Sequence, residues 1–303
     1  MRTRSIGSLA VSVIGLGCNN FGWRIDQAHT REVVDAAIDA GITLFDTADI
    51  YGDTQAETFL GRALEGRRDR VVLATKFGKR GDPAITGGAT ARYVRDAIEG
   101  SLRRLGTDRI DLYQLHEPRP ETPIEETMGV LDELVAQGKV REIGCSNFSA
   151  TQLREAADAA RGPGFVCVQN ELNLLDRDDL DEGLAEAERS GMAYLPYFPL
   201  ASGLLTGKYR RGEPVAAGSR LDTWFDAQER ADVLTESRFD RLEALEAFAS
   251  GHGRSLLELA FAWLLALPPV ASVIAGATSP TQVMANAAAG EWALSPEELA
   301  SVP

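Results

Sequence analysis

Four residues of types that can transfer a proton stand at or just beyond the ends of short apolar runs. Asp46 ends "ITLFD", Tyr51 follows in "TADIYG", Lys76 stands in "VVLATKF" and His116 ends "IDLYQLH". Reduction of a carbonyl needs a proton donor at the oxygen on which negative charge develops. A tyrosine, with a pKa of about 10, is a weak donor alone, but an ammonium beside it stabilises its phenolate and a buried carboxylate holds that ammonium in place. A histidine nearby can hydrogen-bond the carbonyl and orient it.

Each of the four residues also has an ordinary structural interpretation. An aspartate at a strand end commonly caps a helix, a lysine there is commonly solvated, and a single histidine commonly packs in the core. Their occurrence together, on consecutive strand–helix units, indicates an active site if the fold brings them to one place.

Eight apolar runs predict eight strands, at residues 12–17, 42–47, 71–77, 110–116, 141–146, 165–170, 192–198 and 271–276. The runs are nearly continuous in apolar residues, so the strands are expected to be buried on both faces, as in a parallel sheet. Helical patterns lie between them, and three of these begin with a capping box, at 122–125, 149–152 and 255–258.

This alternation predicts an α/β fold, a single (β/α)8 TIM barrel over residues 1–303 with an N-terminal hairpin and a long irregular loop, 201–236, after the seventh strand. A doubly wound sheet competes with it. However, "GLGCNNFG" has glycine at positions 15 and 17 but not at 20, so the dinucleotide fingerprint of that fold is incomplete. In a barrel the active site lies at the carboxyl ends of the strands, where the four residues stand.

Composition excludes several classes of function. The formal net charge of −14 disfavours nucleic acid and anionic membrane surfaces as partners. Three cysteines (18, 145 and 167) offer neither a disulfide framework nor zinc spacing, and three histidines leave little for a metal site, so no metal is expected. Residues 1–18 superficially match a lipoprotein signal, but glycines and serines interrupt the run, and no apolar stretch is long enough to span a membrane. We therefore expect a cytoplasmic protein.

The motifs "FDTADIYG", "ATKFG", "DLYQLH" and "IGCSNFS" together resemble those of the aldo-keto reductase superfamily, and the resemblance extends over essentially the whole chain. It implies an NAD(P)H-dependent oxidoreductase that reduces aldehydes or ketones. The catalytic tetrad of that family falls on Asp46, Tyr51, Lys76 and His116. Tyr51 would be the proton donor, Lys76 and Asp46 the pair that tunes it, and His116 the residue that orients the carbonyl.

The resemblance also implies a cofactor site across the barrel mouth. The carboxamide of the nicotinamide would meet Ser146, Asn147 and Gln169, and the ring would stack on Tyr197. The pyrophosphate would lie in "YFPLASGLLTGKY" and the adenosine in "GATSPTQVMAN". The predicted cofactor-binding residues are Cys18, Asp46, Ser146, Asn147, Gln169, Tyr197, Pro199, Leu200, Gly203, Lys208, Arg220, Gly276, Thr278, Gln282 and Asn286.

Three departures from the family pattern bear on the cofactor and the pocket. Phe198 replaces a common serine, residues 270–290 contain no Lys or Arg for a 2′-phosphate, and "HEPRP" places Arg119 after His116. Because Arg220 and the start of the helix after Thr278 could still hold a phosphate, we favour NADP over NAD.

The loop "CNNFGWRID" should form one wall of the substrate pocket, with Asn19, Asn20 and Trp23 joining Tyr51 and His116. The alternative is that its aromatic residues, Phe21 and Trp23, only pack the loop. Neither the carbonyl substrate nor the oligomeric state can be inferred from the sequence.

Two rival functions remain at this point. One is a nicotinamide-binding regulatory subunit with little turnover, like the channel β subunits that share the fold. The other is a barrel hydrolase or isomerase, which the lack of metal ligands and of a carboxylate pair disfavours.

Overall fold

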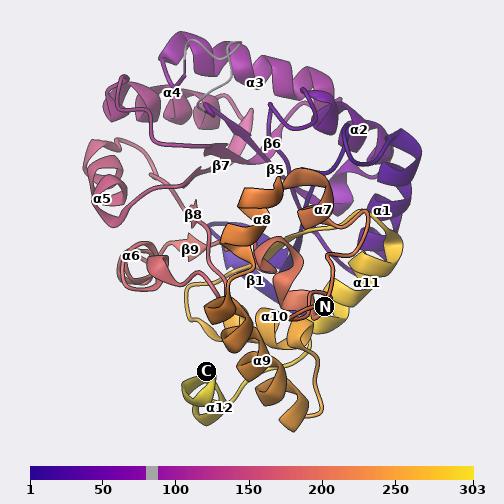
Figure 1. Cartoon of the computed structure of the whole chain (residues 1–303). Coiled ribbons are helices and arrows are strands. Elements are labelled where there is room, and N and C mark those ends of the chain that lie inside the picture. The colour runs from indigo at the N-terminus through magenta and orange to yellow at the C-terminus, as the bar shows by residue number, and fades with distance from the viewer. Residues whose placement is uncertain (80–87) are drawn as a thin grey trace.

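A parallel sheet of eight strands surrounds the centre of the molecule (Figure 1). The computed structural model describes residues 1–79 and 88–303. In spatial order the strands are β10 (Val273–Gly276), β3 (Ile14–Gly17), β4 (Leu44–Asp46), β5 (Val72–Phe77), β6 (Ile110–Leu115), β7 (Val140–Ser146), β8 (Cys167–Gln169) and β9 (Ala193–Tyr194). All eight lie within the predicted runs or within one residue of them.

Backbone hydrogen bonds join the last strand to the first and close the barrel. Ala271 N–H donates to the carbonyl of Tyr194 at 3.0 Å, and Ile274 N–H donates to the carbonyl of Pro196 at 3.0 Å. Every residue of β3 and of β6 is buried, as expected for strands covered on both faces. The prediction of a (β/α)8 barrel is confirmed.

Helices follow the strands and ring the sheet (Figure 1). Their bounds are α1 (Gln27–Asp39), α2 (Gln55–Ala63), α3 (Ala91–Leu105), α4 (Ile124–Ala136), α5 (Ala150–Ala159), α6 (Gly183–Ser190), α9 (Glu236–Gly251), α10 (Leu256–Ala266), α11 (Pro280–Ala289) and α12 (Pro296–Ser301). Short 3-10 helices lie at η1 (Arg68–Arg70) and η2 (Asp178–Leu180).

Two of the three predicted capping boxes are confirmed and one is wrong. Ser149 and Ser255 cap α5 and α10, each with the reciprocal bond from the residue three positions on. Helix α4 instead begins one residue later than predicted, with Pro123 at the cap position and no side-chain cap. Thr122 therefore lies outside the helix, one position too early for a capping box.

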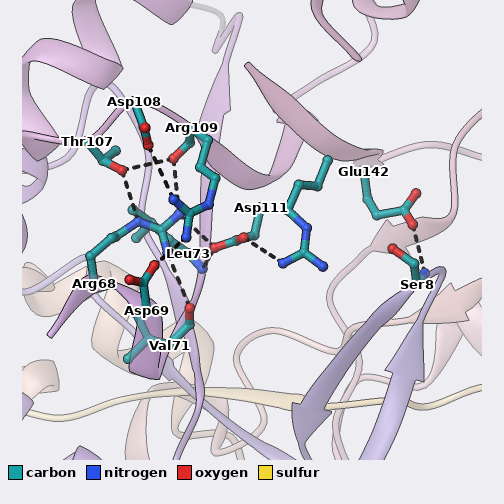
Figure 2. Close-up of polar contacts among 11 residues, drawn as sticks. Ser8, Arg68, Asp69, Val71, Leu73, Thr107, Asp108, Arg109, Asp111 and Glu142 are labelled. Carbon is teal, nitrogen blue, oxygen red and sulfur yellow. Dashed lines mark hydrogen bonds and ion pairs between the residues drawn. The ribbon is translucent and has the colours of Figure 1, made fainter. Parts of the chain in front are cut away.

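An N-terminal hairpin closes the amino end of the barrel. It consists of β1 (Thr3–Ile6) and β2 (Leu9–Ser12), which pair antiparallel, as predicted. Ile6 and Leu9 are buried against side chains from inside the barrel. Ser8 N–H donates to Glu142 Oε1 at 2.7 Å and fastens the turn to β7 (Figure 2). With this end filled, a ligand site belongs at the carboxyl end of the strands.

A buried acid at the amino end fixes three neighbouring strands in register (Figure 2). Asp111 Oδ2 accepts the N–H of Leu73 at 2.9 Å and pairs with Arg68 at 2.7 Å, while Oδ1 pairs with Arg141 at 3.0 Å. Since β5, β6 and β7 are tied together here, the residues at their opposite ends keep fixed relative positions.

The segment 201–236 after β9 is more regular than predicted. It contains η3 (Ala201–Thr206), α7 (Arg220–Trp224) and α8 (Ala227–Val233), and α9 begins at its end. The side chains of Ser219 and Asp226 cap the two short helices. These helices were missed because neither is long enough to show a helical repeat of apolar residues.

Candidate active site

The four tetrad residues meet at the carboxyl end of the barrel. Asp46 is the last residue of β4, Lys76 the fifth residue of β5, and His116 follows β6 directly. Tyr51 lies in the turn between β4 and α2. Lys76 is the strand partner of Gln114 in β6, so these side chains share one level of the sheet.

Asp46 and Lys76 form an ion pair inside the barrel. Lys76 Nζ donates to Asp46 Oδ2 at 2.6 Å and to the carbonyl of Thr47 at 3.0 Å, and both side chains are at most 4% exposed. Asp46 Oδ1 accepts from the side-chain amides of Gln114 at 3.2 Å and Gln169 at 3.1 Å. Burial favours loss of the proton from Lys76, but the charge of Asp46, then that of Tyr51, and the hydrogen bond to Asp46 together outweigh burial and raise the lysine pKa. The lysine is therefore held as an ammonium.

Tyr51 lies between this ammonium and His116. Lys76 Nζ is 5.4 Å from the centroid of the tyrosine ring, and the ring meets the imidazole edge-on at 5.8 Å and 82°. Burial raises the pKa of Tyr51, and Lys76 acts in the opposite direction. The lysine charge thus opposes the effect of burial on the Tyr51 pKa, but burial is the larger of the two. Burial, followed by Lys76 and Lys79, holds the pKa of His116 well below its usual value, so the imidazole is neutral.

The turn that carries Tyr51 is fixed by close backbone packing. Asp49 N–H donates to the carbonyl of Lys76 at 3.0 Å, which ties the turn to β5. Gly52 has a φ of +58°, and a Cβ there would lie 2.3 Å from the carbonyl oxygen of Phe21. Only glycine permits both this conformation and this approach, which explains the glycine after Tyr51.

The residues predicted to meet the nicotinamide carboxamide come together beside the tetrad. Ser146 Oγ donates to the carbonyl of Gln169 at 2.7 Å. Asn147, at a φ of +62°, donates from Nδ2 to the carbonyl of His116 at 2.9 Å and accepts from Tyr197 OH at 2.8 Å. The Tyr197 ring is therefore held in place, half-buried at the barrel mouth, by a residue that also contacts the backbone of His116.

The loop after Tyr197 has an unusual backbone conformation that suits an anion. Phe198, Ala201, Ser202 and Gly203 all have positive φ values, between +44° and +96°. Successive left-handed residues commonly turn backbone N–H groups toward an anion. The Gly203 N–H donates to the carbonyl of Leu200 at 2.7 Å within this loop. Its contact with the pyrophosphate stays a prediction.

Lys208 lies against this loop. A Cβ added to Gly203 would lie 2.6 Å from Lys208 Nζ, so the glycine leaves room for the ammonium. Pro199 is buried beneath the loop, and Leu200 is half-buried in it.

The predicted adenosine-side residues gather between β10 and α11. Helix α11 begins at Pro280, as predicted, and is capped by Ser279. Thr278 donates from its N–H and its hydroxyl to Gln282 Oε1, at 2.8 and 3.1 Å. Asn286 is buried in the same helix. The side chains are therefore grouped as predicted, although Thr278 and Gln282 hydrogen-bond each other.

The loop after β3 leans on this region and does not present all its side chains to a pocket. Phe21 is fully buried, and Asn20 is 8% exposed and donates to the carbonyl of Ala277 at 3.4 Å. A Cβ added to Gly276 would lie 3.2 Å from Asn19 Oδ1. Of the residues predicted to bind substrate here, Asn20 thus faces the adenosine side, Asn19 is half-buried, and Trp23 is 55% exposed.

Cys18 follows β3 directly beneath the tetrad. Its N–H donates to the carbonyl of Asp46 at 2.8 Å and its side chain is fully buried. Burial, and next the charge of Asp46, hold the pKa of this thiol well above its usual value. Cys18 is therefore a protonated, unreactive packing residue at the base of the site.

Comparison with known proteins decides the family. The sequence profile of the Aldo/keto reductase family matches residues 13–303. The chain belongs to the aldo/keto reductase family.

Relatives and solved structures agree with this assignment. Aldo-keto reductase YhdN of Bacillus subtilis is 34% identical over 96% of this chain and 88% of its own length. A probable voltage-gated potassium channel subunit beta of rice is 33% identical over 94% of this chain and 90% of its own. The holo form of aldo-keto reductase AKR11C1 from Bacillus halodurans superposes with a TM-score of 0.82 at 32% identity, covering 100% of this chain and 95% of the other. The glycerol dehydrogenase AKR11B4 from Gluconobacter oxydans gives 0.85 at 30% identity, covering 99% and 93%.

Membership of the aldo/keto reductase family implies NAD(P)H-dependent carbonyl reduction, and the residues present fit such a cofactor. Ser146, Asn147 and Gln169 carry polar side chains at the same end of the barrel as the half-buried Tyr197, whose hydroxyl donates to Asn147, and left-handed backbone follows at residues 198 and 201–203. Hydrogen-bond donors, an aromatic ring and cationic side chains are thus grouped around the barrel mouth. These are the kinds of group that can bind the carboxamide, the nicotinamide ring and the phosphates of a dinucleotide.

Two contacts of this aldo/keto reductase were missed from the sequence. Gln114 donates to Asp46 from the next-but-one strand, and Arg24 stacks on Trp224 with its Cζ 4.1 Å from the ring centroid. A polar residue near the carboxyl end of a buried strand was the available signal for Gln114. Arg24 had none, because its partner lies 200 residues away in the chain.

In the part of the chain that the structure describes, no group of three or more His, Cys, Asp or Glu side chains could hold a metal ion. Over residues 1–79 and 88–303, no helix has the length and apolar character needed to cross a membrane.

Proposed function

We propose that this chain is an NADPH-dependent reductase of aldehydes or ketones, working reversibly as an alcohol dehydrogenase, with Tyr51 as proton donor. The observation that carries the proposal is the arrangement of four side chains at the barrel mouth. The Lys76 ammonium, paired with Asp46 at 2.6 Å, lies 5.4 Å from the ring of Tyr51, which faces His116 edge-on.

A bound nicotinamide dinucleotide supplies the hydride. Tyr51 gives its phenolic proton to the carbonyl oxygen, and the Lys76 ammonium stabilises the phenolate that remains. Asp46 keeps the lysine charged and in position. A neutral His116 has one N–H to donate, which would hold the carbonyl oxygen within reach of the tyrosine. In the reverse direction the phenolate accepts the proton of the alcohol.

The cofactor contacts follow the grouping of side chains around the mouth. Ser146, Asn147 and Gln169 are proposed to bind the carboxamide, and Tyr197 to lie under the ring. Leu200 and Lys208 are proposed for the pyrophosphate. The remaining proposed contacts are Cys18, Pro199, Gly203, Arg220, Gly276, Thr278, Gln282 and Asn286.

NADPH is proposed over NADH because of Arg220. Its guanidinium is half-buried, with its Cζ 3.8 Å from the centroid of Trp224. Burial lowers its pKa to about 10, which still leaves it charged at neutral pH. A cation held in a desolvated setting distinguishes a phosphate from a hydroxyl strongly. NADH is the alternative, since residues 270–290 add no cation.

The substrate side is formed by Tyr51 and His116 with Asn19 and Trp23 at the rim. Trp23 offers an exposed aromatic face there, which suits the apolar part of a carbonyl compound. The proposed substrate is a small molecule, and we place the enzyme in the cytoplasm.

A nicotinamide-binding regulatory subunit is the second candidate function. It is favoured by the relatives in rice and in Schizosaccharomyces pombe, the latter 32% identical over 97% of this chain, whose names describe them as probable and putative channel β subunits. The complete set of Asp46, Tyr51, Lys76 and His116 argues against this candidate. Turnover separates the two candidates.

The test combines two binding titrations with a turnover assay. NADPH and NADH are titrated against tryptophan fluorescence, and consumption of the bound cofactor is then followed with a panel of aldehydes and ketones. In Tyr51→Phe we expect cofactor binding to persist and turnover to fall by a factor of about 10²–10⁴, because only the proton donor is lost. Equal activity in both proteins would refute the mechanism. Tight binding without turnover on any carbonyl would favour the regulatory candidate.

A further inference from the structure

Two arginines at the barrel mouth share an aromatic stack that joins two distant loops. Trp23, in the loop after β3, and Trp224, in α7, have ring centroids 4.4 Å apart. Arg24 Cζ lies 4.1 Å from the centroid of Trp224, and Arg220 Cζ lies 3.8 Å from it. Arg220 Cζ is also 4.8 Å from the centroid of Phe198, next to the nicotinamide-side Tyr197. Both guanidinium groups therefore lie against aromatic rings at the barrel mouth.

Neither guanidinium has a carboxylate partner within ion-pair distance among residues 1–79 and 88–303. By contrast, Arg31 pairs with Asp35 and Arg230 with Asp222. Arg24 has one side-chain hydrogen bond, to Thr223 Oγ1 at 2.6 Å. In the chain as described, the Nε atoms of Arg24 and Arg220 are buried without a hydrogen-bond partner.

This arrangement is costly for an unliganded protein. Burial lowers the pKa of Arg220, and the neighbouring charge of Arg24 lowers it further; Tyr209 and then Glu171 offset this only in part. Acids outnumber bases in this chain by 45 to 31, so carboxylates were available to neutralise the pair. Local features that cost stability without a structural gain commonly mark a binding site.

We propose that Arg24 and Arg220 together bind a phosphate group. A guanidinium presents two parallel N–H donors that match two phosphate oxygens, and a dianion compensates two cations at once. Lys208 extends the positive charge on the same side, since its Nζ lies 5.0 Å from the centroid of the Tyr209 ring, and the Tyr209 hydroxyl accepts the N–H of Leu221, next to Arg220, at 3.4 Å. The phosphate belongs either to the dinucleotide or to a phosphorylated carbonyl substrate, and the first case rests on the proposed function.

The first experiment needs no catalysis. Inorganic phosphate is titrated against tryptophan fluorescence at constant ionic strength set with chloride, because two of the four tryptophans lie in the stack. The proteins are the wild type, Arg24→Gln, Arg220→Gln and a control, Arg95→Gln, whose arginine pairs with Glu133 on the helix surface. We expect saturable binding in the wild type and control, and about tenfold weaker binding in the first two variants. Equal binding in all four, or no response beyond that of chloride, would overturn the proposal.

The second experiment identifies the source of the phosphate by comparing Arg24→Gln with the wild type. A rise of about tenfold in the Kd of NADPH alone assigns the 2′-phosphate, and an equal rise for NADH assigns the pyrophosphate. A raised KM for glyceraldehyde 3-phosphate but not for glyceraldehyde, with cofactor Kd unchanged, assigns a substrate phosphate. No change in any of these values refutes the site.

A further variant and the pattern of results distinguish failure of the phosphate site from failure of the proposed function. Arg24→Lys keeps the charge but loses the planar fork, so it should bind phosphate with intermediate affinity if the geometry matters. If Arg24→Gln does not fold, Arg24→Lys and Arg220→Gln still decide the question. If phosphate binds at the arginine pair but no carbonyl is reduced, the phosphate site is supported and the proposed function is refuted. If the enzyme turns over and its activity does not depend on either arginine, the proposed function is supported and the phosphate site is refuted.

Discussion

Replacement of the buried Asp49 by asparagine should stabilise the protein at neutral and alkaline pH. Asp49 lies in the turn between Asp46 and Tyr51 and is 7% exposed. Its Oδ2 accepts a long hydrogen bond from Tyr93 OH, at 3.4 Å. Its Oδ1 is buried and has no hydrogen bond within the described residues. A carboxylate in this position is poorly compensated.

The magnitude follows from the pKa of this carboxyl. Burial, and next the charge of Glu57, raise the pKa of Asp49 from 3.8 to about 7. Because the folded pKa is raised, the protonated acid stabilises the fold fully below about pH 4, and this contribution is lost as the pH rises through 7. At about 1.4 kcal/mol per pH unit, the loss amounts to about 4 kcal/mol. Burying an amide donor without a partner costs about 1–3 kcal/mol, so Asp49→Asn should gain about 2 kcal/mol at pH 8.

Thermal unfolding at pH 5 and pH 8 tests this reasoning. The wild type, Asp49→Asn and a control at the exposed Asp158, Asp158→Asn, are compared at both pH values. At pH 8 the Tm of Asp49→Asn should rise by about 3 °C, whereas at pH 5 it should stay the same or fall slightly. The control should not respond at either pH. A gain at pH 5 as large as that at pH 8, or a lower Tm at pH 8, would refute the assignment of a raised pKa to Asp49.

Three further predictions concern other parts of the site and its support. Gln114→Leu removes one of two amide donors to Asp46 and should lower kcat by about tenfold or more, with the cofactor Kd unchanged; an unaltered kcat would contradict a role in positioning Asp46. Ser255→Ala removes the capping box of α10 and should lower the free energy of unfolding in urea by about 1 kcal/mol, without effect on kcat. Arg220→Ala should weaken NADPH more than NADH in fluorescence titrations; equal weakening would place Arg220 away from the 2′-phosphate.

The positions of the tetrad could be predicted because strand ends are a property of local sequence. Asp46, Lys76 and His116 follow apolar runs, and a parallel barrel places all such ends on one face. The runs were legible because each strand is buried on both sides and so contains few polar residues. The prediction needed no knowledge of which side chains touch.

Contacts between distant segments could not be predicted in this way. Arg24 and Trp224 meet only because two loops fold over the same strand end, and nothing near either residue signals the other. The hydrogen bond from the Gly203 N–H to Leu200 was missed for a related reason, because it depends on how the turn closes. The predicted cap at Thr122 failed by a single position, which propensity alone does not resolve.

The two groups of cationic side chains at this site, Lys76 and the pair formed by Arg24 and Arg220, differ in whether an acidic side chain neutralises them. Lys76 is deeply buried, and Asp46 neutralises it at 2.6 Å while two amides secure the other oxygen of that carboxylate. The positive charge of Lys76 is therefore neutralised within the protein, whether or not a ligand is bound. Arg24 and Arg220 lie nearer the surface, where acids are abundant, yet the described structure gives them no acidic partner. An internal counter-ion would have to be displaced before an anionic ligand could bind. Lys76 has an internal counter-ion, whereas the arginine pair has none among the described residues. This difference supports our proposal that the arginine pair binds an anionic ligand.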